Sequence, residues 1–373
     1  MAVNRASAGY GGAIEAEYCS DETVAAICGA LRSHGARVEA EEVDADFFAR
    51  CGAIARRHDV VFNVSEGLSR SASRKALVAA AMDHLGVAYT GSGAAATLLA
   101  QDKEMTRRYL GGAVPQPAWT VARGDDPPLP ERLAFPVIVK PASHGSSVGI
   151  EQGCVVSNRA DLRAALARLR ARVSGEALVE SFLGGTEYVA AILGDVVLPA
   201  LAWDWREYPG APLLLDEAME AAGTYAQRGE VIRDLDLHRR LARAAIRAHV
   251  GLGLGDYSRV DLRADAAGEP HLLEVNHCPG LRPAGSLLPR EAAAAGISYG
   301  DLVASIVWLA VRREKARRPR SWLAGVELAP YEAAWRRARE ETTTVAMEVD
   351  GRMYRLVQPR VRARPFGAAA AHK

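Results

Sequence analysis

The sequence has few cysteines, no long apolar run and no excess of charge of either sign. Its 373 residues include 5 cysteines, which are scattered and never spaced as C-x-x-C, so neither a disulfide framework nor a zinc knuckle is expected. No apolar run approaches the roughly 18 residues that a membrane span requires, and the first residues lack a signal-peptide core. The formal net charge of +1 argues against a nucleic-acid or acidic-membrane partner. These absences predict a cytoplasmic protein that binds neither nucleic acid nor membranes.

The common nucleotide-binding fingerprints are also missing. No G-x-x-x-x-G-K-[ST] sequence occurs in the chain. The run GLGLGDY at residues 251–257 looks like a dinucleotide fingerprint, but it follows a helical pattern and precedes a strand pattern, which is the wrong order. A nucleotide site of the P-loop or Rossmann type is therefore not expected.

The chain is long enough for several domains, and its patterns change character along its length. Helical and extended patterns alternate over residues 1–101, which predicts an N-terminal α/β domain. Residues 102–193 and 194–313 favour two further α+β domains. Residues 314–373 contain one helical pattern and a hairpin, whose Asp350-Gly351 pair suits a type I′ turn. The predicted fold class is α/β with α+β regions.

One short stretch combines a buried strand with a loop that has almost no side chains. The strand FPVIVK ends in Lys140, and the next residues include Gly145, Ser146, Ser147 and Gly149. Backbone amides and hydroxyls of such a loop can approach an anion because no bulky side chain stands in the way. Phosphate is the candidate anion. On these residues alone, an ordinary turn beside a surface lysine is an equal alternative.

Two late strands carry a second polar cluster. Arg259 and Asp261 share one face of YSRVDL, and Glu274 and Asn276 share one face of LLEVN, because strand residues alternate. If the strands form an antiparallel hairpin, these pairs come within cross-strand reach. Neighbouring carboxylates repel by about 4 kcal/mol at an effective dielectric of 20, so a cation is expected between them. Oxygen-only ligands favour Mg²⁺, which commonly bridges protein carboxylates to nucleotide phosphates. An exposed, solvated hairpin is the alternative.

Taken together, these stretches resemble the ATP-grasp superfamily, and within it the D-alanine–D-alanine ligase-like enzymes. The similar segments run in family order from about residue 60 to 305: VFNVSEG, VAYTGSG, LLAQDKEMTRRYL, FPVIVKPASHGSSVGI, ALVESFLGGTEYVAAILG, RVDLRADAAGEPHLLEVNHCPGL and SLLPREAAAAGISYGDLV. The resemblance implies an ATP-grasp fold of three domains with a Rossmann-like N-terminal domain, followed here by the tail at 314–373.

The resemblance also implies roles for individual residues. Lys103 and Lys140 would contact ATP phosphates, Glu180 and Glu187 would lie at the adenine and ribose, and the loop from Ser143 to Gly149, with Gly145, Ser146 and Ser147, would close over the triphosphate. Asp261, Glu274 and Asn276 would hold a pair of Mg²⁺ ions, for which Mn²⁺ can substitute. The catalytic set would be Arg259, the Gly280 amide, Ser286 and Ser146. In this chemistry a carboxylate takes the γ-phosphate to become an acyl phosphate, an amine attacks it, and a closed loop keeps water out.

The substrate half departs from the family pattern. Tyr18 stands where these ligases carry a glutamate that grips the first amino group, and Glu17 is one position away. Glu66 replaces their histidine. Their tyrosine- and lysine-bearing loop is absent as a motif, and Tyr225 is the nearest substitute. The loop HCPGLRPAGSLLP is one residue longer than the family's.

The sequence therefore predicts an ATP-dependent carboxylate–amine ligase for small amino-acid-like substrates other than two D-alanines, in specialised metabolism. The alternatives are a D-alanine–D-alanine ligase of cell-wall synthesis, an intramolecular amide cyclase and a non-catalytic ATP-binding protein. The sequence leaves the substrates and a homodimer open.

Overall fold

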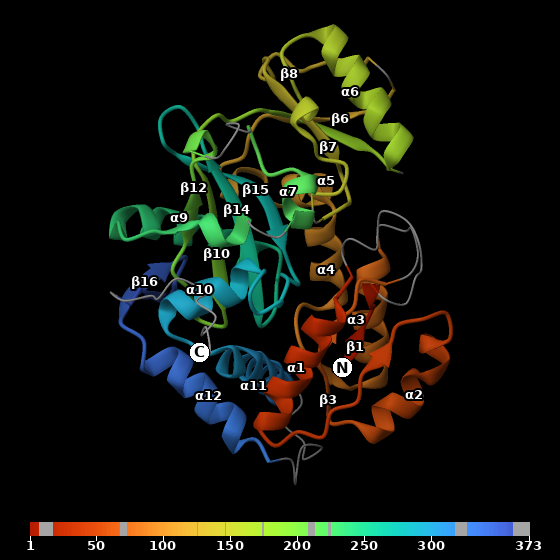
Figure 1. Cartoon of the computed structure of the whole chain (residues 1–373), viewed down its shortest axis with the longest axis vertical. Helices are drawn as coiled ribbons and strands as arrows, with labels where there is room; N and C mark the ends of the chain where they lie inside the picture. The colour runs from red at the N-terminus through yellow and green to blue at the C-terminus, as the bar shows by residue number, and fades with distance from the viewer. Residues whose placement is uncertain are drawn as a thin grey trace, which may run out of the picture.

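Our computed structural model describes residues 1–6, 18–67, 73–124, 126–145, 147–173, 175–207, 213–222, 225–317 and 327–360 (Figure 1). The chain runs from an N-terminal unit, in red and orange, through a small sheet with one helix, in yellow, to a larger sheet flanked by helices, in green to blue. The small sheet stands at one end of the molecule, above the junction of the other two units (Figure 1).

The N-terminal unit alternates short strands with helices, as the sequence pattern predicts. Its elements are β1 (Ala2–Val3), α1 (Asp21–Ser33), β2 (Glu41–Glu42), α2 (Phe47–Arg57), β3 (Val60–Val61), β4 (Asn63–Val64), α3 (Arg74–Leu85), β5 (Ala88–Tyr89) and α4 (Ala94–Gln101). Strand β1 lies between β2 and β4 and is parallel to both, and β3 is parallel to β5. Ser20 caps α1 by accepting a hydrogen bond from the Thr23 amide, and Gly86 ends α3 with a left-handed φ of 71°. Parallel strands joined by helices make this unit Rossmann-like.

The second unit is a small antiparallel sheet covered by one helix. Its elements are α5 (Lys103–Leu110), η3 (Gly111–Ala113), β6 (Trp119–Ala122), β7 (Val137–Pro141), η4 (Gln152–Cys154), β8 (Val155–Val156), α6 (Arg159–Arg172) and β9 (Ala177–Ser181). The strand order is β6-β9-β7-β8. Leu162, Leu166 and Leu169 of α6 are buried in the apolar cluster of this sheet, because they recur on one face of the helix.

The third unit is an 8-stranded sheet between two layers of helices. Its strands are β10 (Glu187–Leu193), β11 (Val196–Val197), β12 (Leu201–Trp203), β13 (Glu230–Val231), β14 (Tyr257–Ala264), β15 (Pro270–Asn276), β16 (Thr344–Val349) and β17 (Arg352–Val357). Its helices are η5 (Trp205–Glu207), α7 (Glu217–Ala222), α8 (Tyr225–Arg228), α9 (Leu235–Gly251), α10 (Leu287–Ala295), α11 (Tyr299–Arg317) and α12 (Ala329–Glu340). Helix α9 packs on one face of the sheet, and α10, α11 and α12 share a core with α1 of the N-terminal unit.

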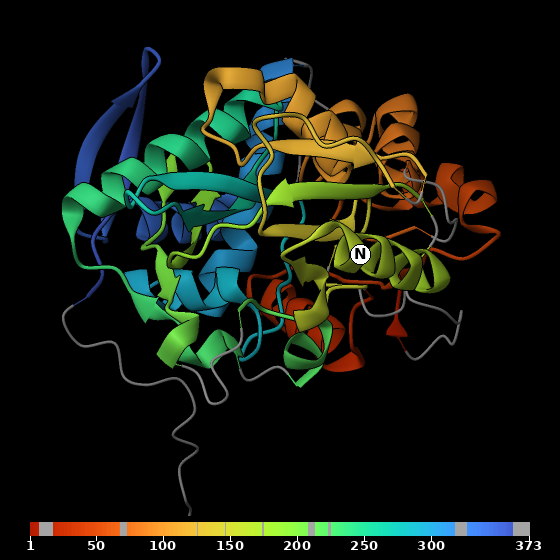
Figure 2. The same ribbon diagram turned by 90° about the horizontal axis from the view of Figure 1, so that it is seen from above.

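Two of the domain divisions expected from the sequence cut through this sheet. The division at residue 193 separates β10 from β14, although these strands pair from Glu187 opposite Arg263 to Leu193 opposite Tyr257. The division at residue 313 falls inside α11, and β17 pairs in parallel with β11. The β16–β17 hairpin lies at the sheet edge away from the N-terminal unit (Figure 2). The tail is therefore part of the large sheet, and pairing between strands so distant in sequence has no local signal.

A membrane span requires a helix that is both long and apolar. No single helix among the described residues meets both requirements. Leu287–Ala295 and Tyr299–Lys315 meet them only as a pair that is bent by 104°.

Candidate active site

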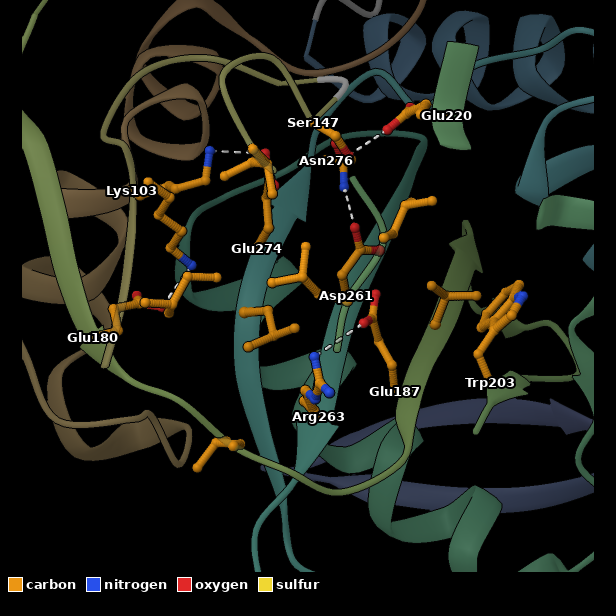
Figure 3. Close-up of a pocket in the computed structure, with 18 of the residues that line it drawn as sticks. Lys103, Ser147, Glu180, Glu187, Trp203, Glu220, Asp261, Arg263, Glu274 and Asn276 are labelled. Carbon is orange, nitrogen blue, oxygen red and sulfur yellow. Dashed lines mark hydrogen bonds and ion pairs between the residues drawn. The ribbon is translucent and has the colours of Figure 1, made fainter. Parts of the chain in front are cut away.

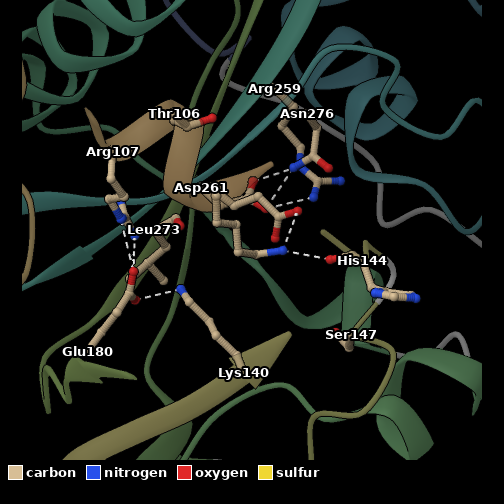
Figure 4. A network of polar contacts seen from close by, with 12 residues as sticks. Thr106, Arg107, Lys140, His144, Ser147, Glu180, Arg259, Asp261, Leu273 and Asn276 are labelled. Carbon is tan, nitrogen blue, oxygen red and sulfur yellow. Dashed lines mark hydrogen bonds and ion pairs between the residues drawn. The ribbon is translucent and has the colours of Figure 1, made fainter. Parts of the chain in front are cut away.

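Strands β14 and β15 place polar side chains opposite one another on one face. Asp261 is paired with Glu274 and Arg259 with Asn276 in the antiparallel register. The Arg259 guanidinium donates to both Asp261 carboxylate oxygens at 2.7 Å, and the Asn276 amide donates to Asp261 Oδ2 at 3.0 Å (Figure 4). All four residues line one cavity. The predicted hairpin and the convergence of its polar groups are confirmed.

Two buried lysines reach the same cavity from neighbouring elements. Lys103 is the first residue of α5; its ammonium donates to the His144 carbonyl at 2.6 Å and lies 3.3 Å from Glu274 Oε1 (Figure 3). Lys140, near the end of β7, lies 2.5 Å from Glu180 Oε2. The side chains of Lys103 and Lys140 are 8% and 9% exposed. The two lysines predicted to bind phosphate thus share a cavity with the acidic hairpin.

Glu180 ties the lysine side of the cavity to the core. Its Oε1 accepts hydrogen bonds from Arg107 Nε at 2.9 Å and Nη2 at 2.6 Å, while Arg107 also donates to the carbonyls of Leu272 and Leu273. Burial alone would raise the pKa of Glu180, but Arg107 and Lys140 outweigh it and hold that pKa below its usual value. One ion cluster therefore joins α5, β7, β9 and β15.

The surroundings of Lys140 carry more positive than negative charge. Burial lowers the pKa of its ammonium; Glu180 opposes this effect, and the nearby Arg107 and Lys103 add to it. Several cations around one buried carboxylate leave a local positive excess. Such an excess suits the phosphates of a nucleotide.

The loop after β7 contributes only part of its length to the cavity. Its lining residues are His144, Ser147, Val148 and Ile150. Ser143, Gly145 and Gly149 are not among the lining residues, and Ser146 lies outside the described residues. Gly149 has a φ of +75°, and a Cβ there would lie 2.9 Å from Leu169 of α6. A glycine is therefore required where this loop packs on α6.

Glu187, predicted at the ribose, begins β10 and lines the cavity. Its carboxylate accepts a hydrogen bond from the Trp205 indole at 2.8 Å and lies 3.6 Å from the Arg263 guanidinium. Burial raises the pKa of Glu187. The ribose contact stays a prediction. Glu180, predicted beside it, is 1% exposed, and its carboxylate is engaged by the two cations of the ion cluster.

The loop after β15 carries the predicted acyl-site groups. Gly280 is exposed, and a Cβ on it would lie 2.7 Å from Ser286 Oγ. The Ser286 hydroxyl accepts a hydrogen bond from the Arg282 amide at 3.0 Å, so it shapes this loop. Leu287, the next residue, lines the cavity, whereas Gly280 and Ser286 do not. Their contact with a substrate stays a prediction.

The donor set of the hairpin fits a hard cation. Asp261 and Glu274 offer carboxylate oxygens from directly opposed positions, and Asn276 offers an amide oxygen on the same face. Oxygen ligands without sulfur or imidazole favour Mg²⁺. These three residues would hold it, and Mg²⁺ would neutralise phosphate charge there.

The family-atypical positions of the N-terminal unit form their own contacts. The Tyr18 hydroxyl donates to the Gly67 carbonyl at 3.3 Å, and Glu66 forms an ion pair with Lys75. Tyr18 and Glu66 are buried, and neither lines the cavity. Glu17 lies outside the described residues.

Sequence reasoning missed two charged residues of this region. Arg107 lies one helical turn after Lys103, and that spacing on α5 was the available signal. Glu220 lies in α7, and its Oε2 accepts a hydrogen bond from Ser147 Oγ at 2.5 Å. Tyr225, the nearest substitute in this segment, also lines the cavity and packs against Trp203 with ring centroids 6.4 Å apart; its role in place of the family's tyrosine stays a prediction. The segment around α7 has no clear apolar period, so the sequence did not place Glu220.

Comparisons with known proteins agree with this geometry. The family model described as D-ala D-ala ligase C-terminus matches residues 120–308. The D-alanine–D-alanine ligase of Halorhodospira halophila is 37% identical over 262 residues, covering 69% of this chain and 81% of that protein. The ligase of the same name from Methylococcus capsulatus is 35% identical over 286 residues, covering 74% and 86%. Among solved structures, that of Bacillus anthracis D-alanine–D-alanine ligase complexed with ATP has a TM-score of 0.63 at 23% identity, covering 79% of this chain and 93% of that one.

The fold and these relatives together show an ATP-dependent ligase of the ATP-grasp class that forms a C–N bond. Within that class, the chain belongs to the D-alanine–D-alanine ligase family. The predicted resemblance is confirmed.

Proposed function

We propose that this protein joins two D-alanine molecules, with ATP and Mg²⁺ as cofactors. The expectation of a different substrate depended on Tyr18, Glu66 and the missing loop motif. Similarity to relatives named D-alanine–D-alanine ligase, over more than 80% of their length, favours the alternative that the sequence left open. The observation that carries the proposal is the cavity in which Lys103 and Lys140 face the acidic hairpin.

Each group in the cavity suits one part of the reaction. A carboxylate oxygen of the first amino acid attacks the γ-phosphorus, and ADP leaves. The ammonium of the second amino acid loses a proton, the resulting amine attacks the acyl carbon, and the adduct loses a second proton as phosphate leaves. Lys103 and Lys140 bind phosphate oxygens, and the Arg259 guanidinium stabilises negative charge that develops on the transferred group. The pKa of Arg259 is raised because Asp261 outweighs the effect of burial, so the guanidinium stays charged.

The loop from Ser143 to Gly149 protects the intermediate. Acyl phosphates hydrolyse readily, so water must be excluded while the amine approaches. Ser147 and Val148 line the cavity, and residues 147–152 are hydrogen-bonded to residues 216–220, which ties the loop to the segment around α7. Water exclusion and nucleotide binding therefore depend on the same loop.

The test is ADP release with single amino acids and with pairs. With ATP, Mg²⁺ and D-alanine, the protein should release ADP and form a product whose mass equals two alanines minus water. L-alanine should release no ADP. ADP release only with other amino acids, or with one substrate and no second amine, would refute the proposal in favour of a different ligase or a cyclase.

A further inference from the structure

Helix α7 and the residues before it hold the loop after β7 through several hydrogen bonds. The Glu217 amide donates to the Ile150 carbonyl at 3.0 Å, and Glu217 Oε2 accepts from the Gly149 amide at 3.0 Å. The Gln152 side chain donates to Asp216 at 2.8 Å. These bonds fix the position of α7 against the loop, so the direction of the side chains on α7 is set.

Glu220 differs from the other acidic residues of the cavity in its partners. Each of those carboxylates has a cation beside it: Lys140 and Arg107 for Glu180, Arg263 for Glu187, Arg259 for Asp261 and Lys103 for Glu274. Among the described residues, Glu220 accepts a hydrogen bond from Ser147 alone and has no ion pair. Burial raises its pKa more than the Ser147 hydroxyl and the more distant Arg259 lower it, and a bound cation would offset this effect of burial.

Glu220 lies across the cavity from Lys103 and Glu180. Figure 3 shows it beside Ser147 at the side where Asn276 and Asp261 lie, whereas Lys103 and Glu180 lie at the other side. Glu217, one turn earlier on α7, is not among the cavity-lining residues and pairs with Arg172 at 2.7 Å. Glu220 is therefore the residue of α7 whose charge faces the reaction.

We propose that Glu220 binds the ammonium group of the amino acid that attacks the acyl phosphate, and so selects an amine over a hydroxyl acceptor. This inference rests on the proposed function. A D-amino acid arrives with a positive charge on the nitrogen that later attacks the acyl carbon as a free amine. Among the described residues, Glu220 is the cavity carboxylate that forms no ion pair. Glu220 thus acts as a specificity-determining residue for the second amino acid.

The experiment compares Glu220→Gln with Glu217→Gln, two identical substitutions one turn apart on α7. Glutamine at 220 keeps an acceptor for Ser147 and removes the charge. We measure kcat/KM with D-alanine as the acceptor and with D-lactate, which has a hydroxyl in place of the ammonium; if D-lactate is not turned over, its inhibition constant against D-alanine replaces its kcat/KM. The preference for D-alanine over D-lactate should fall at least tenfold in Glu220→Gln, the loss expected from one charged hydrogen bond. It should be unchanged in Glu217→Gln, and Glu220→Asp should keep most of it.

A second measurement separates the two amino-acid sites. Hydroxylamine replaces the acceptor and traps the acyl phosphate as a hydroxamate, so the KM for D-alanine then reports the first site alone. That KM should be the same in Glu220→Gln and in the unsubstituted protein. An equal preference in both proteins, or a loss confined to the hydroxamate assay, would overturn the assignment. If the unsubstituted protein releases no ADP with D-alanine, the proposed function fails by itself; the same variants are then compared with the amino acid that does release ADP and its hydroxy-acid analogue.

Discussion

Replacing Glu180 by glutamine should destabilise the protein far more than the same change at an exposed glutamate. The side chains of Glu180 and Arg107 are each 1% exposed, and that of Lys140 is 9% exposed. Removal of one partner of a buried ion pair costs about 3–5 kcal/mol, because the remaining charge stays buried without compensation. Two cations lose their carboxylate here, although glutamine still offers an oxygen to Arg107. We therefore expect a loss of about 3 kcal/mol or more in the free energy of unfolding.

Glu151→Gln is the matched control. Glu151 pairs with Arg168 at 3.0 Å, but the two side chains are 44% and 48% exposed, and such surface pairs contribute roughly 0–1 kcal/mol. Urea unfolding at pH 7, followed by tryptophan fluorescence without nucleotide, gives both values. If the free energies of unfolding of the two variants differ by less than about 1 kcal/mol, the buried ion cluster does not stabilise the protein as expected here.

Nucleotide should rescue Glu180→Gln more than it stabilises the unsubstituted protein. Phosphate oxygens would supply the negative charge that Lys140 and Arg107 have lost, so a non-hydrolysable ATP analogue should return part of the missing stability. The stability that Glu180 contributes to the unsubstituted protein should decrease as the pH falls. Because the folded-state pKa of Glu180 is depressed, its contribution is present above its unfolded pKa of about 4.3 and is lost as the pH falls through the lower folded value. Equal stabilisation of both proteins by the analogue would show that the cluster lies outside the reach of the phosphates.

Three further outcomes are expected. Glu274→Ala should abolish ADP release without unfolding the protein, whereas Glu269→Ala, at the exposed turn of the same hairpin, should leave it intact; ADP release by the first variant at the unsubstituted rate would contradict the metal site. The buried His249 has its pKa lowered to about 4 by burial, so the unfolded state takes up the proton first and stability falls with pH below about 6.5. Between pH 7 and pH 5, this protonation should lower the free energy of unfolding by about 2 kcal/mol. In urea titrations, His249→Gln should reduce that loss. Leu356→Ala should lower the free energy of unfolding by about 2–5 kcal/mol, because this side chain is fully buried. Met353→Ala should change it little, because Met353 is 60% exposed. Equal melting temperatures of the two variants would show that the tail hairpin contributes little to the stability of the sheet.

The sequence predicted those parts of the site whose residues are close in the chain. Arg259 and Asp261, or Glu274 and Asn276, share a face because of the two-residue period of a strand, and the short connector turns the strands back on each other. The lysine at the end of an apolar strand and the loop after it were recognised for the same reason. These inferences needed only local geometry.

The rest depended on contacts that leave no local trace. Arg107 meets Glu180 73 positions away and Leu272 165 positions away, so its helix pattern could not reveal its partners. The neighbouring strands β7 and β9 set the ion pair of Lys140 with Glu180, since Ile138 lies opposite Glu180 in that register. The tail hairpin was recognised as a hairpin, but its pairing through β17 with β11 was not, because a parallel contact between residues near 196 and 355 has no signature in either segment.

Ser147 connects the two halves of the site. It lies in the loop expected to close over the triphosphate, it has a left-handed φ of 53°, and its hydroxyl is held by Glu220. Opening of the loop for nucleotide entry, as its proposed role requires, would break this bond and the bonds of Glu217 to Gly149 and Ile150. Under the proposal above, Glu220 would hold the acceptor ammonium beside the acyl carbon only after the loop has returned. The same closure would therefore exclude water from the acyl phosphate and bring the acceptor's binding group into place, so that the intermediate meets an amine before it meets water.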